Sequence, residues 1–160
     1  MLLIPHFWGH TFAIKADGPP VRVRRFLITA KIAKATYIYR DPRDVVISAF
    51  EHGKKNRRAG IRGGFAELDS IDKAILFVKK ELIAWDEWMQ YGQALPVRYE
   101  DLVADTVHEL KRLVEFLEVD ISIRVLQDIA ATYQPKNGSF RPFGGRRCLF
   151  YTKAYLYVDR

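Results

Sequence analysis

The sequence predicts an α/β protein in three layers, with a mostly parallel sheet flanked by helices on both faces. Short segments rich in β-branched and aromatic residues predict strands at 12–16, 35–40 and 95–100, and longer helical segments alternate with them. The middle segment, "ATYIY", lacks polar alternation, which is typical of a strand covered on both faces. In such folds ligands bind at the carboxyl ends of the strands.

Capping residues locate the helices. Asp41 is a good N-cap, and Pro42 follows in the first helical position, where a missing N–H costs nothing. Ser70 begins a long segment with apolar residues at three- and four-residue spacing. Asp105 caps a further amphipathic segment, and residues 120–133 predict a helix after it.

Glycine and arginine are concentrated in two stretches, 53–65 and 135–147, which predict mobile basic loops. No internal repeat and no linker divides the chain. Residues 1–160 are therefore predicted to form a single domain, which is long enough to bury a core.

Composition excludes several classes of protein. Hydrophobic residues make up 49% of the chain, which argues against intrinsic disorder. No apolar run approaches the roughly 20 residues of a membrane span, and the first residues do not resemble a signal peptide. The single cysteine, Cys148, cannot form a disulfide within the chain and gives no support for a zinc site. These features predict a cytoplasmic protein without a metal.

Positive charge is concentrated in one part of the sequence. The net charge is +7, and residues 21–62 contain twelve Lys or Arg against three acidic residues. Such asymmetry predicts an anionic partner: a nucleic acid, a membrane surface or a phosphorylated small molecule. A solvated basic face without a ligand is the alternative.

Arg40 follows the predicted strand and precedes the predicted helix. A guanidinium beside the free N–H groups of a helix start is suited to binding a phosphate, and the Ser48 hydroxyl, two turns into the helix, can reach the same anion. The alternative is structural. In that interpretation Arg40 forms an ion pair with Asp41 or Asp44, and Ser48 is a small packing residue.

The segment "YIYRDPRDVVIS" (37–48) resembles the 3′-phosphate-binding segment of sulfotransferases that use 3′-phosphoadenosine-5′-phosphosulfate (PAPS). In that family an arginine ends a strand, a serine follows eight residues later, and both bind the 3′-phosphate; Arg40 and Ser48 have this spacing. The segment 95–122 resembles the family's strand, "YEDL" and helix, in which a tyrosine at the place of Tyr99 lies near the adenine.

The resemblance extends over residues 12–122 and implies a P-loop-like sulfotransferase fold, incomplete at the N-terminus. It implies transfer of a sulfonate from PAPS to a hydroxyl or amine of an unidentified small-molecule or sugar acceptor, without a metal. "FAIKADGPP" falls where the family has a Lys-Thr-His element. Lys15 therefore corresponds to the lysine nearest the transferred group.

The chain also departs from the family pattern. The phosphosulfate-binding loop, Pro-Lys-Ser-Gly-Thr-Thr-Trp, is not found, so we expect an N-terminally truncated domain. Asp17 stands where the family has its histidine base, and a carboxylate is a weaker base beside an anionic donor. Near the C-terminus, Arg141, Arg146 and Arg147 either replace the family's basic phosphate-binding loop or form a solvated tail.

These departures leave two alternatives to an active enzyme. One is a catalytically inactive remnant that binds the nucleotide product, adenosine 3′,5′-bisphosphate, but transfers nothing. The other is a nucleic-acid-binding domain that uses the basic residues of 53–65, although no aromatic stacking pattern accompanies them. A missing first strand would leave part of the sheet uncovered, so we also expect self-association into a homo-oligomer.

Overall fold

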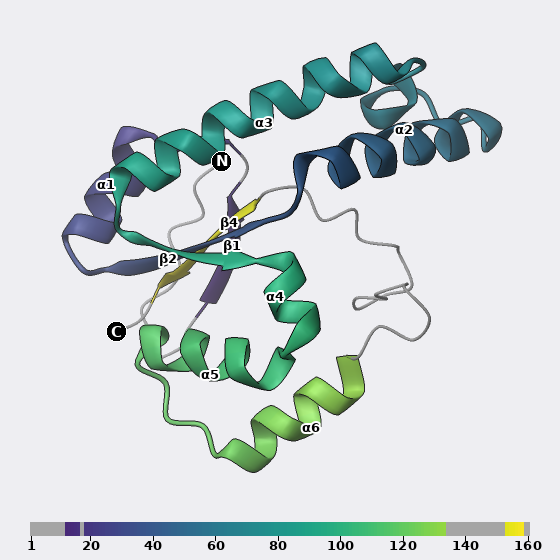
Figure 1. Ribbon diagram of the computed structural model, residues 1–160. Helices are drawn as coiled ribbons and strands as arrows, with labels where there is room; N and C mark the ends of the chain where they lie inside the picture. The colour runs from purple at the N-terminus through teal and green to yellow at the C-terminus, as the bar shows by residue number, and fades with distance from the viewer. Residues whose placement is uncertain (1–11, 17, 134–152, 159–160) are drawn as a thin grey trace.

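A sheet of four strands forms the centre of the part of the chain that the computed structural model describes, residues 12–16, 18–133 and 153–158 (Figure 1). Its strands are β1 (Phe12–Ala16), β2 (Ala33–Tyr39), β3 (Ala94–Arg98) and β4 (Lys153–Val158). Their order across the sheet is β1-β4-β2-β3. β2 and β3 pair in parallel, and β4 is antiparallel to both β1 and β2. β1, β2 and β3 therefore run in one direction, as predicted for a mostly parallel sheet.

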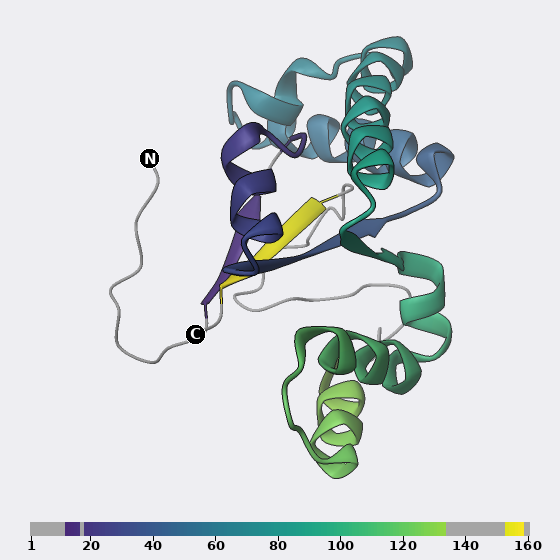
Figure 2. The same cartoon turned by 90° about the vertical axis from the view of Figure 1, so that its left-hand side faces the viewer.

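Helices cover both faces of this sheet. They are α1 (Arg22–Thr29), α2 (Pro42–Arg58), α3 (Ile71–Tyr91), α4 (Tyr99–Ala104), α5 (Thr106–Leu117) and α6 (Ile123–Tyr133), with a 3₁₀ turn η1 (Gly64–Glu67). α1 and α3 pack on one face, where α2 lies beside α3, whereas α4 and α5 contact β3 from the other side (Figures 1 and 2). The predicted three-layer α/β arrangement is confirmed.

The predicted capping residues begin their helices. The Asp41 carboxylate accepts a hydrogen bond from the Arg43 backbone N–H at 2.9 Å. The Ser70 hydroxyl accepts one from the Lys73 N–H at 3.2 Å. The Asp105 carboxylate does the same for the N–H of the third residue after it, at 3.0 Å. Local side-chain chemistry thus fixed these helix starts, as expected for N-caps.

β2 is a deeply buried strand. Ala35, Thr36 and Tyr37 are consecutive and all buried, so both faces of the strand are covered, as the apolar pattern predicts. Tyr37 packs against Trp88 of α3, with ring centroids 6.1 Å apart. Trp88 is fully buried, and its indole N–H donates to the Gly18 carbonyl at 3.0 Å. The core therefore holds the strand that leads to Arg40 in a fixed position.

The prediction of a loop from residue 53 is wrong, because α2 continues to Arg58. Gly53 is buried, and a Cβ atom placed there would lie 2.3 Å from the Phe65 carbonyl oxygen. The glycine is therefore a packing residue that lets η1 approach α2, and it does not break the helix. Arg57 fastens the two elements together, since its Nη1 donates to the carbonyls of Ala66 at 3.0 Å and Leu68 at 2.8 Å.

Other element boundaries also differ from those predicted. The strand expected over 95–100 ends at Arg98, and α4 begins at Tyr99. α1 and β4 were not predicted, and α6 begins at Ile123 instead of residue 120. The sequence pattern did not indicate α1, because only Ile28 is buried among its eight residues and three of them are arginines. The predicted loop 135–147 lies outside the described residues.

Candidate functional site

The carboxyl ends of the two parallel strands converge on a pocket of about 360 Å³. Arg40 follows the last residue of β2, and Arg98 is the last residue of β3. The pocket is lined by Tyr39, Arg40, Asp41, Pro42, Leu82, Trp85 and Arg98. Its position agrees with the rule that ligands of parallel α/β sheets bind at the carboxyl edge. Its wall is largely aromatic and aliphatic, with two guanidinium groups among the polar members.

The start of α2 forms one side of this pocket. Asp41 caps the helix, and its carboxylate also accepts hydrogen bonds from the Arg43 side chain, the shortest at 2.6 Å. These bonds, side chain first and backbone N–H second, lower the pKa of Asp41 to about 2. The Asp41 backbone N–H donates to the Glu100 carboxylate at 3.0 Å, which ties the start of α2 to α4.

Arg40 is held between two of these elements. Its guanidinium carbon lies 4.8 Å from the centroid of the Tyr99 ring, a cation–π contact with the first residue of α4. Its Nη2 donates to the Asp44 carboxylate at 2.8 Å. Its Nε is buried and has no hydrogen-bond partner among the described residues. Because an unsatisfied buried donor is costly, this nitrogen marks a place where an acceptor is lacking.

Ser48 lies on the face of α2 that also carries Asp44. Residues four apart on a helix are neighbours, so Asp44 and Ser48 lie along one side of α2, and Asp44 contacts Arg40, which precedes the helix. Ser48 is half-buried. The ion pair between Arg40 and Asp44, which the structural alternative predicts, is therefore present. The contact between Arg40 and Tyr99 was not predicted. An anion that bound Arg40 from the side of Ser48 would meet the Asp44 carboxylate first.

Lys15 lies elsewhere on the sheet. It is an exposed residue of β1, and it is opposite position 155 of β4, which in turn is opposite Thr36 of β2. Lys15 is thus level with a residue four positions before Arg40, an offset of about 13 Å along the strands and roughly 10 Å across them. The structure does not bring Lys15 to the Arg40 pocket. Asp17, Arg141, Arg146 and Arg147 lie outside the described residues.

Sequence reasoning missed two residues that line the pocket, Trp85 and Arg98, and one residue beside it, Glu100. Trp85 was assigned to the apolar face of its helix, yet its ring lines the pocket and packs 6.1 Å from that of Tyr39. Arg98 is the last residue of β3, and Arg40 directly follows β2. This similarity between the two arginines is visible in the sequence. The Nε of Arg98 lies 3.2 Å from the Glu100 carboxylate. Glu100 belongs to the "YEDL" segment, but its bond to the Asp41 N–H could not be predicted, because it depends on the contact between α2 and α4.

His52, a histidine of α2, is a packing residue. Its ring meets Phe65 edge to face, with centroids 5.3 Å apart. Burial, and secondly the charge of Lys55, lower the pKa of His52. Among the described residues there is no cluster of three or more potential metal ligands, and no helix is long and apolar enough to cross a bilayer.

Comparison with known proteins establishes the family. The sulfotransferase domain family matches residues 20–145, so the chain belongs to this family. Two WSCD family members, from Drosophila pseudoobscura pseudoobscura and Drosophila melanogaster, are 31% and 29% identical over 123 residues, covering 70% of this chain and 36% of each relative. Sulfotransferase 2A6 of Rattus norvegicus is 25% identical over 126 residues, covering 68% of this chain and 42% of the relative. The chain therefore spans less than half the length of these relatives. No solved structure matches.

Proposed function

We propose that this chain is the nucleotide-anchoring part of a PAPS-dependent sulfotransferase domain. Arg40 and Ser48 bind the 3′-phosphate of the nucleotide, and Tyr99 lies beside the adenine. The observation that carries the proposal is the position of Arg40: its guanidinium is fixed over Tyr99 at the carboxyl edge of the sheet, with Nε lacking a partner among the described residues. Membership of the sulfotransferase family supports sulfotransfer in general.

Anchoring of this kind supplies binding energy for positioning. A guanidinium and a hydroxyl on a phosphate far from the reacting sulfur act equally in the ground state and the transition state, unless that binding energy aligns the reacting groups. The sulfonate leaves the nucleotide for an acceptor oxygen or nitrogen, the acceptor proton passes to a base, and adenosine 3′,5′-bisphosphate is released. Lys15 is the residue of this chain that we assign to the transferred group, and Asp17 occupies the place of the base.

We propose that transfer by this chain alone is impaired, because a carboxylate at position 17 is a weak base beside an anionic donor. An assay with radiolabelled PAPS and a panel of alcohols, phenols, amines and sugars tests this. Turnover by the pure chain would contradict impairment. Binding of the bisphosphate without turnover would agree with the alternative of a nucleotide-binding remnant.

The anchoring role has a direct test. Titration of adenosine 3′,5′-bisphosphate into Arg40→Ala should show binding weaker by about 1.5–3 kcal/mol, the range for hydrogen bonds to charged groups. Arg43→Ala is the matched control, because it removes the same charge three residues away, from a side chain that is 89% exposed and paired with Asp41. We expect little change in that variant.

A second ligand separates binding of the 3′-phosphate by Arg40 from a general electrostatic attraction of the nucleotide to the protein. Adenosine 5′-monophosphate lacks the 3′-phosphate, so its affinity should be nearly the same for wild type and Arg40→Ala. Equal affinity of both proteins for the bisphosphate would remove Arg40 from the site. Equal losses for both ligands would place Arg40 on another part of the nucleotide.

A further inference from the structure

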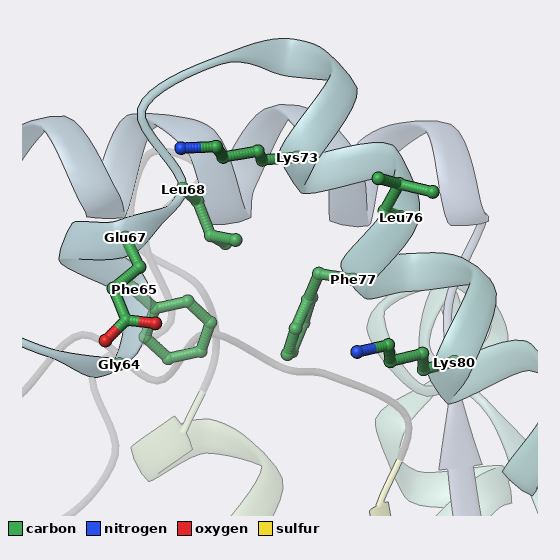
Figure 3. A pocket seen from close by; sticks show the side chains of 8 residues that line it. All are labelled: Gly64, Phe65, Glu67, Leu68, Lys73, Leu76, Phe77 and Lys80. Atoms are coloured by element: carbon green, nitrogen blue, oxygen red, sulfur yellow. The ribbon is translucent and has the colours of Figure 1, made fainter.

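A second pocket, of about 500 Å³, lies between η1 and the first half of α3. Its floor is apolar. Phe65 and Phe77 meet edge to face there, with ring centroids 5.6 Å apart, and Leu68 is buried beside them (Figure 3). Leu76 forms part of the wall and remains 58% exposed. The volume falls in the range of pockets that bind small molecules, about 300–1,000 Å³.

Charged groups stand at the edge of this apolar floor. Lys80 extends from α3 on one side, and Glu67 lies on the η1 side (Figure 3). Lys73, also at the edge, is engaged by the Asp69 carboxylate at 2.8 Å. Within the described part of the chain, Lys80 forms no ion pair. Among the described residues, the pocket therefore offers the Lys80 ammonium group, without an ion pair, beside two aromatic rings.

This pocket is distinct from the one at the strand ends. Lys73, Phe77 and Lys80 are spaced three and four residues apart, so they share one face of α3. The α3 residues that line the strand-end pocket, Leu82 and Trp85, lie on another face, because helical geometry turns about 100° per residue. A ligand bound over Phe77 would thus approach α3 from a different side than the nucleotide.

We infer that this second pocket binds an amphipathic monoanion: an aromatic or short aliphatic body carrying one sulfonate, sulfate or carboxylate group. The body would cover Phe65, Phe77 and Leu76, and the anionic group would pair with Lys80. One available cation and the nearby Glu67 carboxylate favour a single negative charge over a polyanion. This site goes beyond the proposed nucleotide site and does not depend on it.

Calorimetric titration of the full chain with naphthalene-1-sulfonate tests the inference. Two control ligands separate the charged group of naphthalene-1-sulfonate from its rings. Methanesulfonate carries the charge without the rings, and naphthalene-1-methanol carries the rings without the charge. We expect saturable binding of the naphthalenesulfonate, weaker binding of the neutral alcohol, and none of methanesulfonate. Absence of saturable naphthalenesulfonate binding would overturn the inference.

Two variants with opposite expected effects on affinity test whether naphthalenesulfonate binds in this pocket. Lys80→Gln should weaken naphthalenesulfonate binding about threefold to fivefold, the effect of an exposed ion pair, and leave the neutral alcohol unchanged. Lys79→Gln, an exposed neighbour outside the pocket, is the matched control and should change nothing. Glu67→Gln should strengthen sulfonate binding about twofold, because it removes a like charge.

Two further measurements distinguish this pocket from other sites. Leu76→Ser removes exposed apolar surface without disturbing a buried side chain, so it should weaken binding of both naphthalene ligands. Saturating adenosine 3′,5′-bisphosphate should leave naphthalenesulfonate binding in place. Displacement of naphthalenesulfonate by the bisphosphate would place the sulfonate at another site and overturn the inference. An affinity for naphthalenesulfonate that is unchanged in both Leu76→Ser and Lys80→Gln would do the same.

Discussion

The two ends of α2 use arginine in different ways. At its start, Arg40 stacks on Tyr99 and pairs with Asp44, and its Nε lacks a partner among the described residues. Near its end, Arg57 donates to the backbone carbonyls of Ala66 and Leu68 and joins α2 to η1. Both arginines belong to the same strongly basic stretch of sequence. The density of positive charge therefore does not separate these two arginines, whereas the hydrogen bonds of their donors do.

The largest expected effect on stability concerns the C-terminal half of α2, which packs against η1. In Gly53→Ala the new Cβ would lie 2.3 Å from the Phe65 carbonyl oxygen and 3.0 Å from that of Leu68. Because backbone atoms cannot yield cheaply, we expect the free energy of unfolding to fall by about 1–3 kcal/mol in urea denaturation.

Gly60→Ala provides the comparison for that variant. A Cβ atom there would meet nothing within 4 Å, but Gly60 has a φ of +70°. Its cost should be about 1 kcal/mol and arise from backbone conformation alone. If Gly53→Ala were instead more stable than wild type, as an exposed helical site would be, the close contact between α2 and η1 would be wrong.

The second prediction separates the two arginines directly. Arg57→Gln removes the donors to two buried carbonyls, so the protein should lose about 1–3 kcal/mol of unfolding free energy. Its affinity for adenosine 3′,5′-bisphosphate should not change, since Arg57 lies at the far end of α2. Arg40→Ala should show the reverse pattern, with weaker binding and little loss of stability.

Arg58→Gln is the matched control for this pair, because Arg58 is an exposed neighbour of Arg57. It should alter neither measurement. Weaker bisphosphate binding in Arg57→Gln, measured on protein verified to be folded, would show that the basic end of α2 contributes to the ligand site after all.

A smaller effect is expected at Asp44. Its carboxylate occupies the Arg40 guanidinium at 2.8 Å and carries a charge that repels a phosphate. Asp44→Asn should therefore bind adenosine 3′,5′-bisphosphate about twofold to fivefold more tightly, the scale of an exposed ion pair, in calorimetric titration. Glu51→Gln, which neutralises a carboxylate two turns further along α2, should not. Weaker binding in Asp44→Asn would mean that Asp44 positions Arg40 instead of competing for it.

Local chemistry explains what the sequence predicted well. The N-caps Asp41, Ser70 and Asp105 begin helices through bonds to residues two or three positions away. The apolar stretch of β2 is buried on both faces, as its pattern indicates. The family resemblance implied that Arg40 and Tyr99 serve one nucleotide, but it did not predict the contact between them.

Long-range packing explains what the sequence failed to predict. Gly53 lies in a stretch rich in glycine and arginine, which predicts a loop. Only the close approach of the Phe65 carbonyl explains why a glycine stands at this position of the helix. β4 enters the sheet between β1 and β2 from the far end of the chain. Glu100 lies within the "YEDL" segment, but its bond to the start of α2 depends on tertiary packing, and Trp85 lies in no motif. Such contacts depend on tertiary structure, which short sequence windows do not contain.

The smallest expected effect concerns the cap of α2. The pKa of Asp41 is lowered to about 2, chiefly by the Arg43 side chain and then by the Arg43 N–H. A carboxyl group whose pKa is lower in the folded protein stabilises it above the unfolded pKa, about 3.9, and this contribution is lost as the pH falls through the folded value. Wild type should therefore lose stability between about pH 4 and pH 2 that Asp41→Asn does not lose.

Melting temperatures of the two proteins across this range provide the measurement. Asparagine also caps helices, so the comparison isolates the charge, and the difference between the two curves should narrow toward pH 2. Parallel curves would show that Arg43 does not hold the Asp41 carboxylate. Arg43 would then be available to an anion, and the Nε of Arg40, which lacks a partner among the described residues, would no longer distinguish Arg40 from Arg43. A narrowing difference would instead agree with a guanidinium of Arg43 that the Asp41 carboxylate holds.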